Sequence, residues 1–295
     1  MIINENFLKM KSKNKIPFAR QKVTVTTLCV MVAMLFVLSS CKEKTEPEIN
    51  EKSFENIEKS FDGGVDTICK ITTYSESIKD KYVYPIRPGT PEWDHIETVK
   101  QRIDILQIPE SVLATISTAG LLETCLEFPY LIEIFFGNHY QDGFEALLRL
   151  LNGFRVLFER SDLTDVLIEK YISLSEEVKD VRIQSPINQG RFSLRHFVLE
   201  FMFVQDAVLN NLNMEQIDAL ILLTKERTQL KKYYSDIFGS HHALPSSLLY
   251  SKILVKNNLV TESIKELLVD FIQNPIFIQE EIVDYLDNYV NGINK

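Results

Sequence analysis

Cysteine, tryptophan and histidine are scarce in this chain of 295 residues, which contains four Cys, one Trp and five His. The few cysteines lack the short paired spacings of zinc sites, which need three or four converging ligands. The sequence also lacks a glycine-rich phosphate loop, a Gly-x-Ser-x-Gly elbow and a His-Glu-x-x-His motif. The chain therefore carries none of the familiar signatures of nucleotide-binding proteins, serine hydrolases or zinc proteases. We expect neither a cofactor nor a metal.

The four cysteines lie in different contexts. Cys29 lies inside an N-terminal apolar run and Cys41 follows it, so Cys69 and Cys125 remain for the rest of the chain. Two thiols in an exported protein can pair, because that compartment is oxidising. Cys125, however, lies in an apolar stripe with helical spacing, where a buried free thiol is common. We expect two unpaired thiols, with a Cys69–Cys125 disulfide as the alternative.

Residues 1–40 have the pattern of a secretory signal peptide. A basic leader precedes an apolar run, 23–37, and small residues follow in Leu38-Ser39-Ser40-Cys41. These three parts occur in the order that is typical of cleaved signals. The apolar run of about 15 residues is shorter than the ~20 that span hydrocarbon, so we favour a cleaved signal over a retained membrane anchor.

The segment Leu38-Ser39-Ser40-Cys41 resembles the lipobox of bacterial lipoproteins. That resemblance implies that Cys41 is lipidated and becomes the first mature residue. The acidic residues shortly after Cys41 also resemble the surface-export signals of Bacteroidetes lipoproteins. We therefore expect a lipid-anchored protein of the cell outer membrane, with periplasmic and surface-exposed orientations both open.

The charge of the mature chain limits its partners. Without residues 1–40, the chain has 26 basic and 40 acidic residues, a net charge of −14. Such a chain repels nucleic acid and anionic lipid headgroups. We therefore expect no nucleic-acid partner, and we expect membrane attachment only through lipid on Cys41.

Two segments precede the main domain. Residues 41–60 are charged and poor in apolar side chains, which predicts a flexible tether. Residues 61–90 are predicted to form an extended arm, since Pro85, Pro88 and Pro91 disfavour helix up to Gly89. The remaining residues, 91–295, are predicted to form one helical domain.

Apolar residues recur at helical spacing through the whole predicted domain. No β-hairpin signal follows Gly89, and no repeat of about 34 or 40 residues keeps its register. We therefore predict an all-α fold, a single irregular helical array after an extended Pro-rich arm, with a bundle and a short α-solenoid both open. Loops are expected at 138–142, 185–190 and 239–245. Helices are expected near 91–107, 109–113, 118–127, 130–136, 142–160, 163–174, 194–209, 213–238, 246–257, 261–272 and 275–291.

The opening of the domain also carries a resemblance. Residues 84–93, Tyr-Pro-Ile-Arg-Pro-Gly-Thr-Pro-Glu-Trp, look like the start of an uncharacterised family of exported Bacteroidetes proteins. An Ile-Pro-Glu element at 108–110 and stretches at 117–126 and 140–144 are similar to further parts of that family. The resemblance covers residues 82 to about 160 and implies export, but it implies no activity.

The loop at 138–142 is the first candidate binding site. A turn there needs only a capping residue and a flexible one, and Asp142 and Gly143 supply both. His139, Tyr140 and Gln141 exceed that requirement and offer donors, acceptors and an aromatic face. The pattern favours a capped turn with exposed polar side chains, and binding of a partner by His139, Tyr140 and Gln141 is the alternative hypothesis.

Arg87 and Trp93 form the second candidate, together with Tyr82 and Tyr84. A cation beside aromatic rings is typical of surfaces that stack on sugars. The alternative is a docking latch, in which the arm packs on the domain and Arg87 is stacked or paired.

A catalytic site has weaker support. His196 and Glu200 are four residues apart and share a helix face, but a pair without a third partner is not a catalytic constellation. The adjacent pair His241-His242 is best interpreted as part of a polar loop. We therefore favour an interaction module that binds a protein or glycan. The alternative is an envelope or surface hydrolase that uses His139 or His196 with carboxylates.

Overall fold

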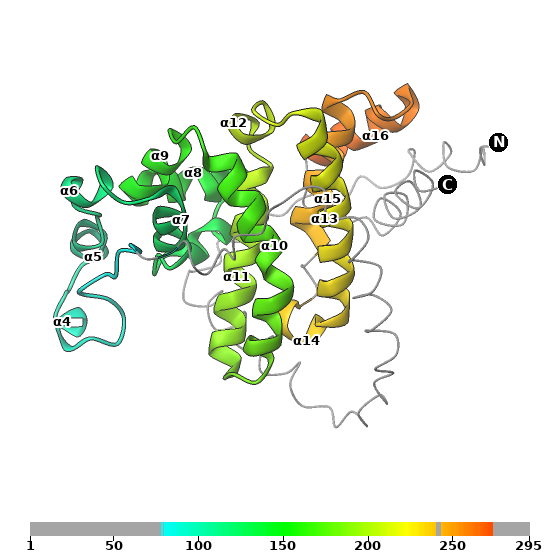
Figure 1. Cartoon of the computed structure of the whole chain (residues 1–295). Helices are drawn as coiled ribbons and strands as arrows, with labels where there is room; N and C mark the ends of the chain where they lie inside the picture. Colours follow the sequence, from blue (N-terminus) through cyan, green and yellow to red (C-terminus); the bar gives the residue numbers. More distant parts are fainter. Residues whose placement is uncertain (1–77, 79, 240–242, 274–295) are drawn as a thin grey trace, which may run out of the picture. The chain divides into compact units, whose positions relative to one another are not determined.

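The computed structural model describes residues 78, 80–239 and 243–273 (Figure 1). All of these residues belong to one compact unit of the chain. Several predictions lie outside the described residues. They concern the signal peptide, the lipidated Cys41, the tether, Cys69, the pair His241-His242 and the helix at 275–291.

The described part of the chain contains thirteen α-helices, one 3-10 helix and no strand, which confirms the predicted all-α class. None of these helices is both long and apolar enough to cross a membrane.

The described end of the arm packs against helix α7, Thr118–Leu126. The Tyr82 backbone N–H donates to Thr124 Oγ1 at 3.0 Å, and the Tyr84 hydroxyl donates to the Thr124 carbonyl at 3.1 Å. Lys81 and Glu127 form an ion pair at 2.8 Å. Tyr84 is buried, so residues 80–84 are part of the domain rather than a free extension.

The predicted helix 91–107 is wrong as a single element, because the structure divides it into α4, Pro91–Asp94, and α5, Val99–Ile105. A capping box causes the restart. Thr98 Oγ1 accepts from the Gln101 backbone N–H at 3.2 Å, and the Gln101 side chain accepts from the Thr98 N–H at 3.1 Å.

The next segment follows the sequence prediction. Helix α6, Glu110–Leu113, begins after Pro109, and Ser117 caps α7 through the Gly120 N–H at 3.0 Å. All nine residues of α7 are buried, including the free thiol of Cys125, whose pKa burial raises well above its usual value. The expected helix 130–136 is a 3-10 helix, η2, Leu131–Phe135.

The predicted helix 142–160 is also divided, into α8, Tyr140–Leu150, and α9, Asn152–Phe158. A residue far away in the sequence stabilises the break between the two helices. The Asn152 side chain accepts from the Ile108 N–H at 3.0 Å and donates to the Ile108 carbonyl at 2.8 Å. Gly153 therefore lies at the start of a helix rather than inside one. A Cβ there would lie 2.6 Å from Ile108 Cδ1, so the Gly153 backbone packs closely against Ile108.

The second half of the described chain consists mainly of long helices (Figure 1). The helices α10, α11, α13 and α15 pack together as a set of four. Helix α10 contacts α11 and α13, and helix α15 contacts the same two helices. The elements are α10, Leu163–Arg182; α11, Pro186–Phe203; α12, Asp206–Leu209; α13, Met214–Tyr233; α14, Ser235–Phe238; α15, Ala243–Lys256; and α16, Glu262–Gln273.

The predicted loop at 185–190 is wrong, because α11 begins at Pro186. Ser185 accepts from the Asn188 N–H at 3.4 Å, and a proline suits the first helical position. A capping box of Asn213 with Gln216 opens α13, with the Gln216 N–H donating to Asn213 Oδ1 at 2.9 Å.

Candidate functional site

A groove of about 580 Å³ opens where α8, α9, α11, α12, α15 and α16 meet. Its floor is apolar and buried, and is formed by Phe144, Phe201, Val204 and Leu248. Its polar lining consists of His139, Gln141, Asp142, Gln205, Asp206, Lys252 and Gln273. Ligand sites in proteins combine an apolar surface with a few polar groups, and this groove has both.

The polar lining is bonded across helices. The side-chain amides of Gln141 and Gln205 donate to each other at 3.2 and 3.3 Å, which joins the first turn of α8 to the α11–α12 connection. Lys252 of α15 donates to the Val204 carbonyl at 2.8 Å, near the C-terminal end of α11. The same ammonium lies 3.5 Å from the carboxylate of Asp206. The rim is therefore held in place by side chains from three elements.

Two of the three residues predicted in the loop 138–142 line this groove. His139 and Gln141 are exposed and belong to its polar lining. Asp142 accepts from the His139 backbone N–H at 3.2 Å, so its carboxylate caps α8 as the sequence predicts. The segment is less of a loop than expected, because α8 already begins at Tyr140.

Tyr140 has a different role from its neighbours. Its ring is half-buried and lies 6.0 Å from the Phe135 ring, 5.4 Å from Phe197 and 6.5 Å from Phe201, between ring centroids. Burial raises the pKa of its hydroxyl. Tyr140 therefore packs in an aromatic cluster and supports the fold of η2, α8 and α11.

The two residues of the second candidate site, Arg87 and Trp93, differ in burial. Trp93 is only 8% exposed, and the cation over its ring is Arg102, 5.2 Å from the ring centroid. Arg87 is exposed, and its backbone forms a turn with Thr90. With Trp93 and Tyr84 buried, the arrangement supports the latch interpretation rather than a sugar-stacking surface.

The His196–Glu200 pair lies inside the α10, α11, α13 and α15 set. The Glu200 carboxylate accepts from the Tyr171 hydroxyl at 2.7 Å, from Lys231 at 2.7 Å and from Ser246 Oγ at 3.1 Å. All five side chains are buried. Glu200 therefore connects helices inside the core and does not line the groove.

His196 has no catalytic partner in the described residues. Its Nδ1 is buried and makes no hydrogen bond among the residues that the structure describes. Burial lowers the pKa of the ring well below its usual value, and the cations of Lys170, Lys231, Arg227 and Arg195 lower it further. Within residues 80–239 and 243–273, no group of three or more His, Cys, Asp or Glu side chains is arranged to hold a metal ion.

Sequence reasoning missed most of the groove. Phe201 and Leu248 follow an apolar pattern that indicates only core, and Gln205 and Lys252 have no unusual local context. Gln141 and Gln205 are 64 residues apart, so their contact leaves no sign in a local pattern.

No protein family model matches the chain, and no curated protein or solved structure matches it either. The resemblance of residues 82–160 to exported Bacteroidetes proteins therefore stays a prediction, and function has to be argued from the geometry of the site.

Proposed function

We propose that this chain is a lipid-anchored interaction module of the bacterial cell envelope, held at the outer membrane by lipid on Cys41. Its binding site is the groove between α8 and α15. The observation that carries the proposal is a groove of about 580 Å³ with an apolar floor and a rim fixed by the Gln141–Gln205 amide pair. This volume lies within the range of about 300–1,000 Å³ that is usual for ligand sites.

Within that proposal, a protein segment is a better ligand than a glycan. Sugar recognition relies on exposed aromatic faces, and the aromatic candidates of the arm, Trp93 and Tyr84, are buried. The groove instead has a floor suited to an apolar side chain, and side-chain amides at the rim suited to hydrogen bonds with a peptide backbone.

The hydrolase alternative has less support. Asp142 already accepts from the His139 backbone, and within the described ranges no carboxylate lies at hydrogen-bond distance from the His139 ring. His196 is buried beside a Glu200 that is bonded to three other side chains. A general base needs hydrogen-bond reach to a substrate, and neither histidine is placed with a partner for that role.

The test compares two double variants of the full chain in capture experiments from envelope extract. His139→Ala with Gln141→Ala removes two rim side chains, and His95→Ala with Glu97→Ala is the control, at two exposed residues with the same spacing. We expect the rim variant to lose protein capture while its thermal midpoint stays near that of the control. Equal capture by both variants contradicts the groove as the binding site. Capture that survives protease treatment of the extract favours a glycan instead.

A further inference from the structure

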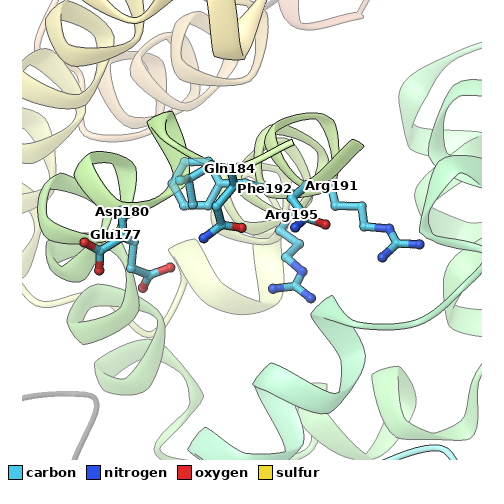
Figure 2. A pocket seen from close by; sticks show the side chains of 8 residues that line it. Glu177, Asp180, Gln184, Arg191, Phe192 and Arg195 are labelled. Atoms are coloured by element: carbon cyan, nitrogen blue, oxygen red, sulfur yellow. The ribbon is translucent and has the colours of Figure 1, made fainter. Parts of the chain in front are cut away.

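A second hollow, of about 380 Å³, lies between α10 and α11 and is separate from the groove (Figure 2). Two carboxylates, Glu177 and Asp180, belong to α10, whereas two guanidinium groups, Arg191 and Arg195, belong to α11. Figure 2 shows the acids and the arginines on opposite sides, with Gln184 and Phe192 between them. We call this hollow the α10–α11 notch.

The spacing of these residues explains why they face one another. Glu177 and Asp180 are three apart on α10, and Gln184 follows four residues later, just past the end of that helix at Arg182. Arg191 and Arg195 are four apart on α11. Such steps place side chains on one face of a helix. The two helices contact each other and are joined by a short turn, so each presents one charged row to the notch.

The inner charge of each row is already paired within the protein. Glu177 accepts from Lys170 at 2.7 Å and from Ser173 Oγ at 2.6 Å. Arg195 donates to Glu127 at 3.2 Å. These bonds hold both side chains at the walls of the notch and leave the outer charges to a ligand.

The outer charges, Asp180 and Arg191, are exposed, and neither forms an ion pair with any residue that the structure describes. They lie on opposite walls, with the buried ring of Phe192 between the helices. That ring is fixed by the His196 ring at 4.3 Å and the Phe238 ring at 5.8 Å. The notch therefore presents a negative and a positive group that the fold keeps apart.

We propose that the α10–α11 notch binds a short zwitterionic peptide, with its carboxylate on Arg191 and its terminal ammonium on Asp180. A planar guanidinium matches a carboxylate with two parallel hydrogen bonds. A simple anion meets the acids of α10, and a simple cation meets the arginines of α11, so a ligand with both charges fits best. The amides of Gln184 and Asn188 line the same notch and suit peptide groups. This site does not depend on the function proposed for the groove.

The experiment is calorimetric titration of the full chain with three probes. Trialanine has both charges, N-acetyl-trialanine lacks the ammonium, and trialanine amide lacks the carboxylate. We expect trialanine to bind about tenfold more tightly than either analogue, since one charge-assisted hydrogen bond is worth about that factor.

Two variants test which residue binds the carboxylate of the peptide and which binds its ammonium. Arg191→Gln is expected to abolish the preference for trialanine over its amide and to keep the preference over N-acetyl-trialanine. Asp180→Asn is expected to do the reverse. Arg155→Gln and Asp218→Asn change exposed residues of the same types elsewhere and should leave both preferences intact. The proposal is overturned if trialanine does not bind at millimolar concentration, if the three probes bind equally, or if the notch variants behave like their controls.

Discussion

The ammonium of Lys231 lies 2.7 Å from both carboxylate oxygens of Glu200, and the two side chains are only 3% and 1% exposed. The pair joins α13 to α11, while Tyr171 of α10 and Ser246 of α15 bond to the same carboxylate. Removing two charges from water is unfavourable, and close hydrogen-bonded geometry offsets that loss. One carboxylate therefore fixes four helices in a single arrangement.

Breaking this pair should destabilise the domain strongly. Lys231→Met leaves a buried carboxylate without its cation, for which we expect a loss of about 3–5 kcal/mol in the free energy of unfolding. Glu200→Gln combined with Lys231→Met should lose clearly less than the sum of the single variants, because it removes both charges. Urea unfolding measures these values. The exposed pair of Arg149 with Glu145 is the control, and Arg149→Met should change stability by less than about 1 kcal/mol. Additive effects of Glu200 and Lys231 would contradict the coupling.

His196 should make the domain sensitive to mild acid. Burial and four nearby cations hold its folded-state pKa well below its usual value, whereas the unfolded ring titrates near 6.5. Below about pH 6.5 the unfolded state therefore binds a proton that the folded state does not. Stability is retained above that pH and falls as pH decreases, by up to about 1.4 kcal/mol per pH unit.

Urea unfolding between about pH 7 and pH 5 checks this slope. His196→Phe should flatten it, since the site is already lined by the rings of Phe192 and Phe238. His95→Phe changes an exposed histidine and should leave the slope unchanged. If both variants keep the slope of the unchanged protein, another group causes the acid sensitivity.

The sequence predicted the elements whose signals are local. Such local signals include the cap at Ser117, the proline that opens α4 and the box of Asn213 with Gln216, each of which acts within three residues and marks the start of a helix in the structure. The helices that were wrongly predicted as continuous have two different causes. The break between α8 and α9 depends on Asn152 bonding to Ile108, 44 residues away, and no local pattern contains such a contact. At 95–98, a capping box that is visible in the sequence overrides a continuous apolar stripe.

The candidate site could also be predicted only where the signal is local. His139 and Gln141 are polar beyond what a turn requires, and both line the groove. Tyr140 has the same local context, yet it packs among phenylalanines from η2 and α11. Burial depends on neighbours from distant segments, so local sequence cannot separate a binding aromatic from a core aromatic.

Trp93 provides a direct test of the latch. Because its ring is buried beside Tyr130 and Arg102, Trp93→Ala should lower the free energy of unfolding by ~3–5 kcal/mol, as for other large core truncations. Arg87→Ala, at an exposed side chain six residues earlier, should change it by less than about 0.5 kcal/mol. Urea denaturation separates the two outcomes. A loss below about 1 kcal/mol for Trp93→Ala would return the ring to a ligand-binding role.

Cys41 tests the anchor, which lies outside the described residues. If the lipobox interpretation is right, Cys41→Ala should abolish incorporation of labelled fatty acid and leave the precursor uncleaved or the protein free of the membrane. Cys69→Ala is the control and should be labelled, processed and fractionated like the unchanged chain. A Cys41→Ala protein that is still labelled and still membrane-bound would exclude lipid attachment at that position.

Two glycines should respond to alanine in opposite directions. A Cβ on Gly143 would collide with the backbone of Ile134, where α8 lies directly against η2, so Gly143→Ala should cost about 2 kcal/mol or more. Gly190 lies within α11, where a Cβ would meet nothing within 4 Å. Gly190→Ala should therefore stabilise the domain by about 0.5–1 kcal/mol, through the better helix propensity of alanine. Thermal and urea unfolding of both variants measure the two shifts. Destabilisation by Gly190→Ala would show that residues 185–190 form a loop in solution, as their sequence first suggests, rather than the first turns of α11.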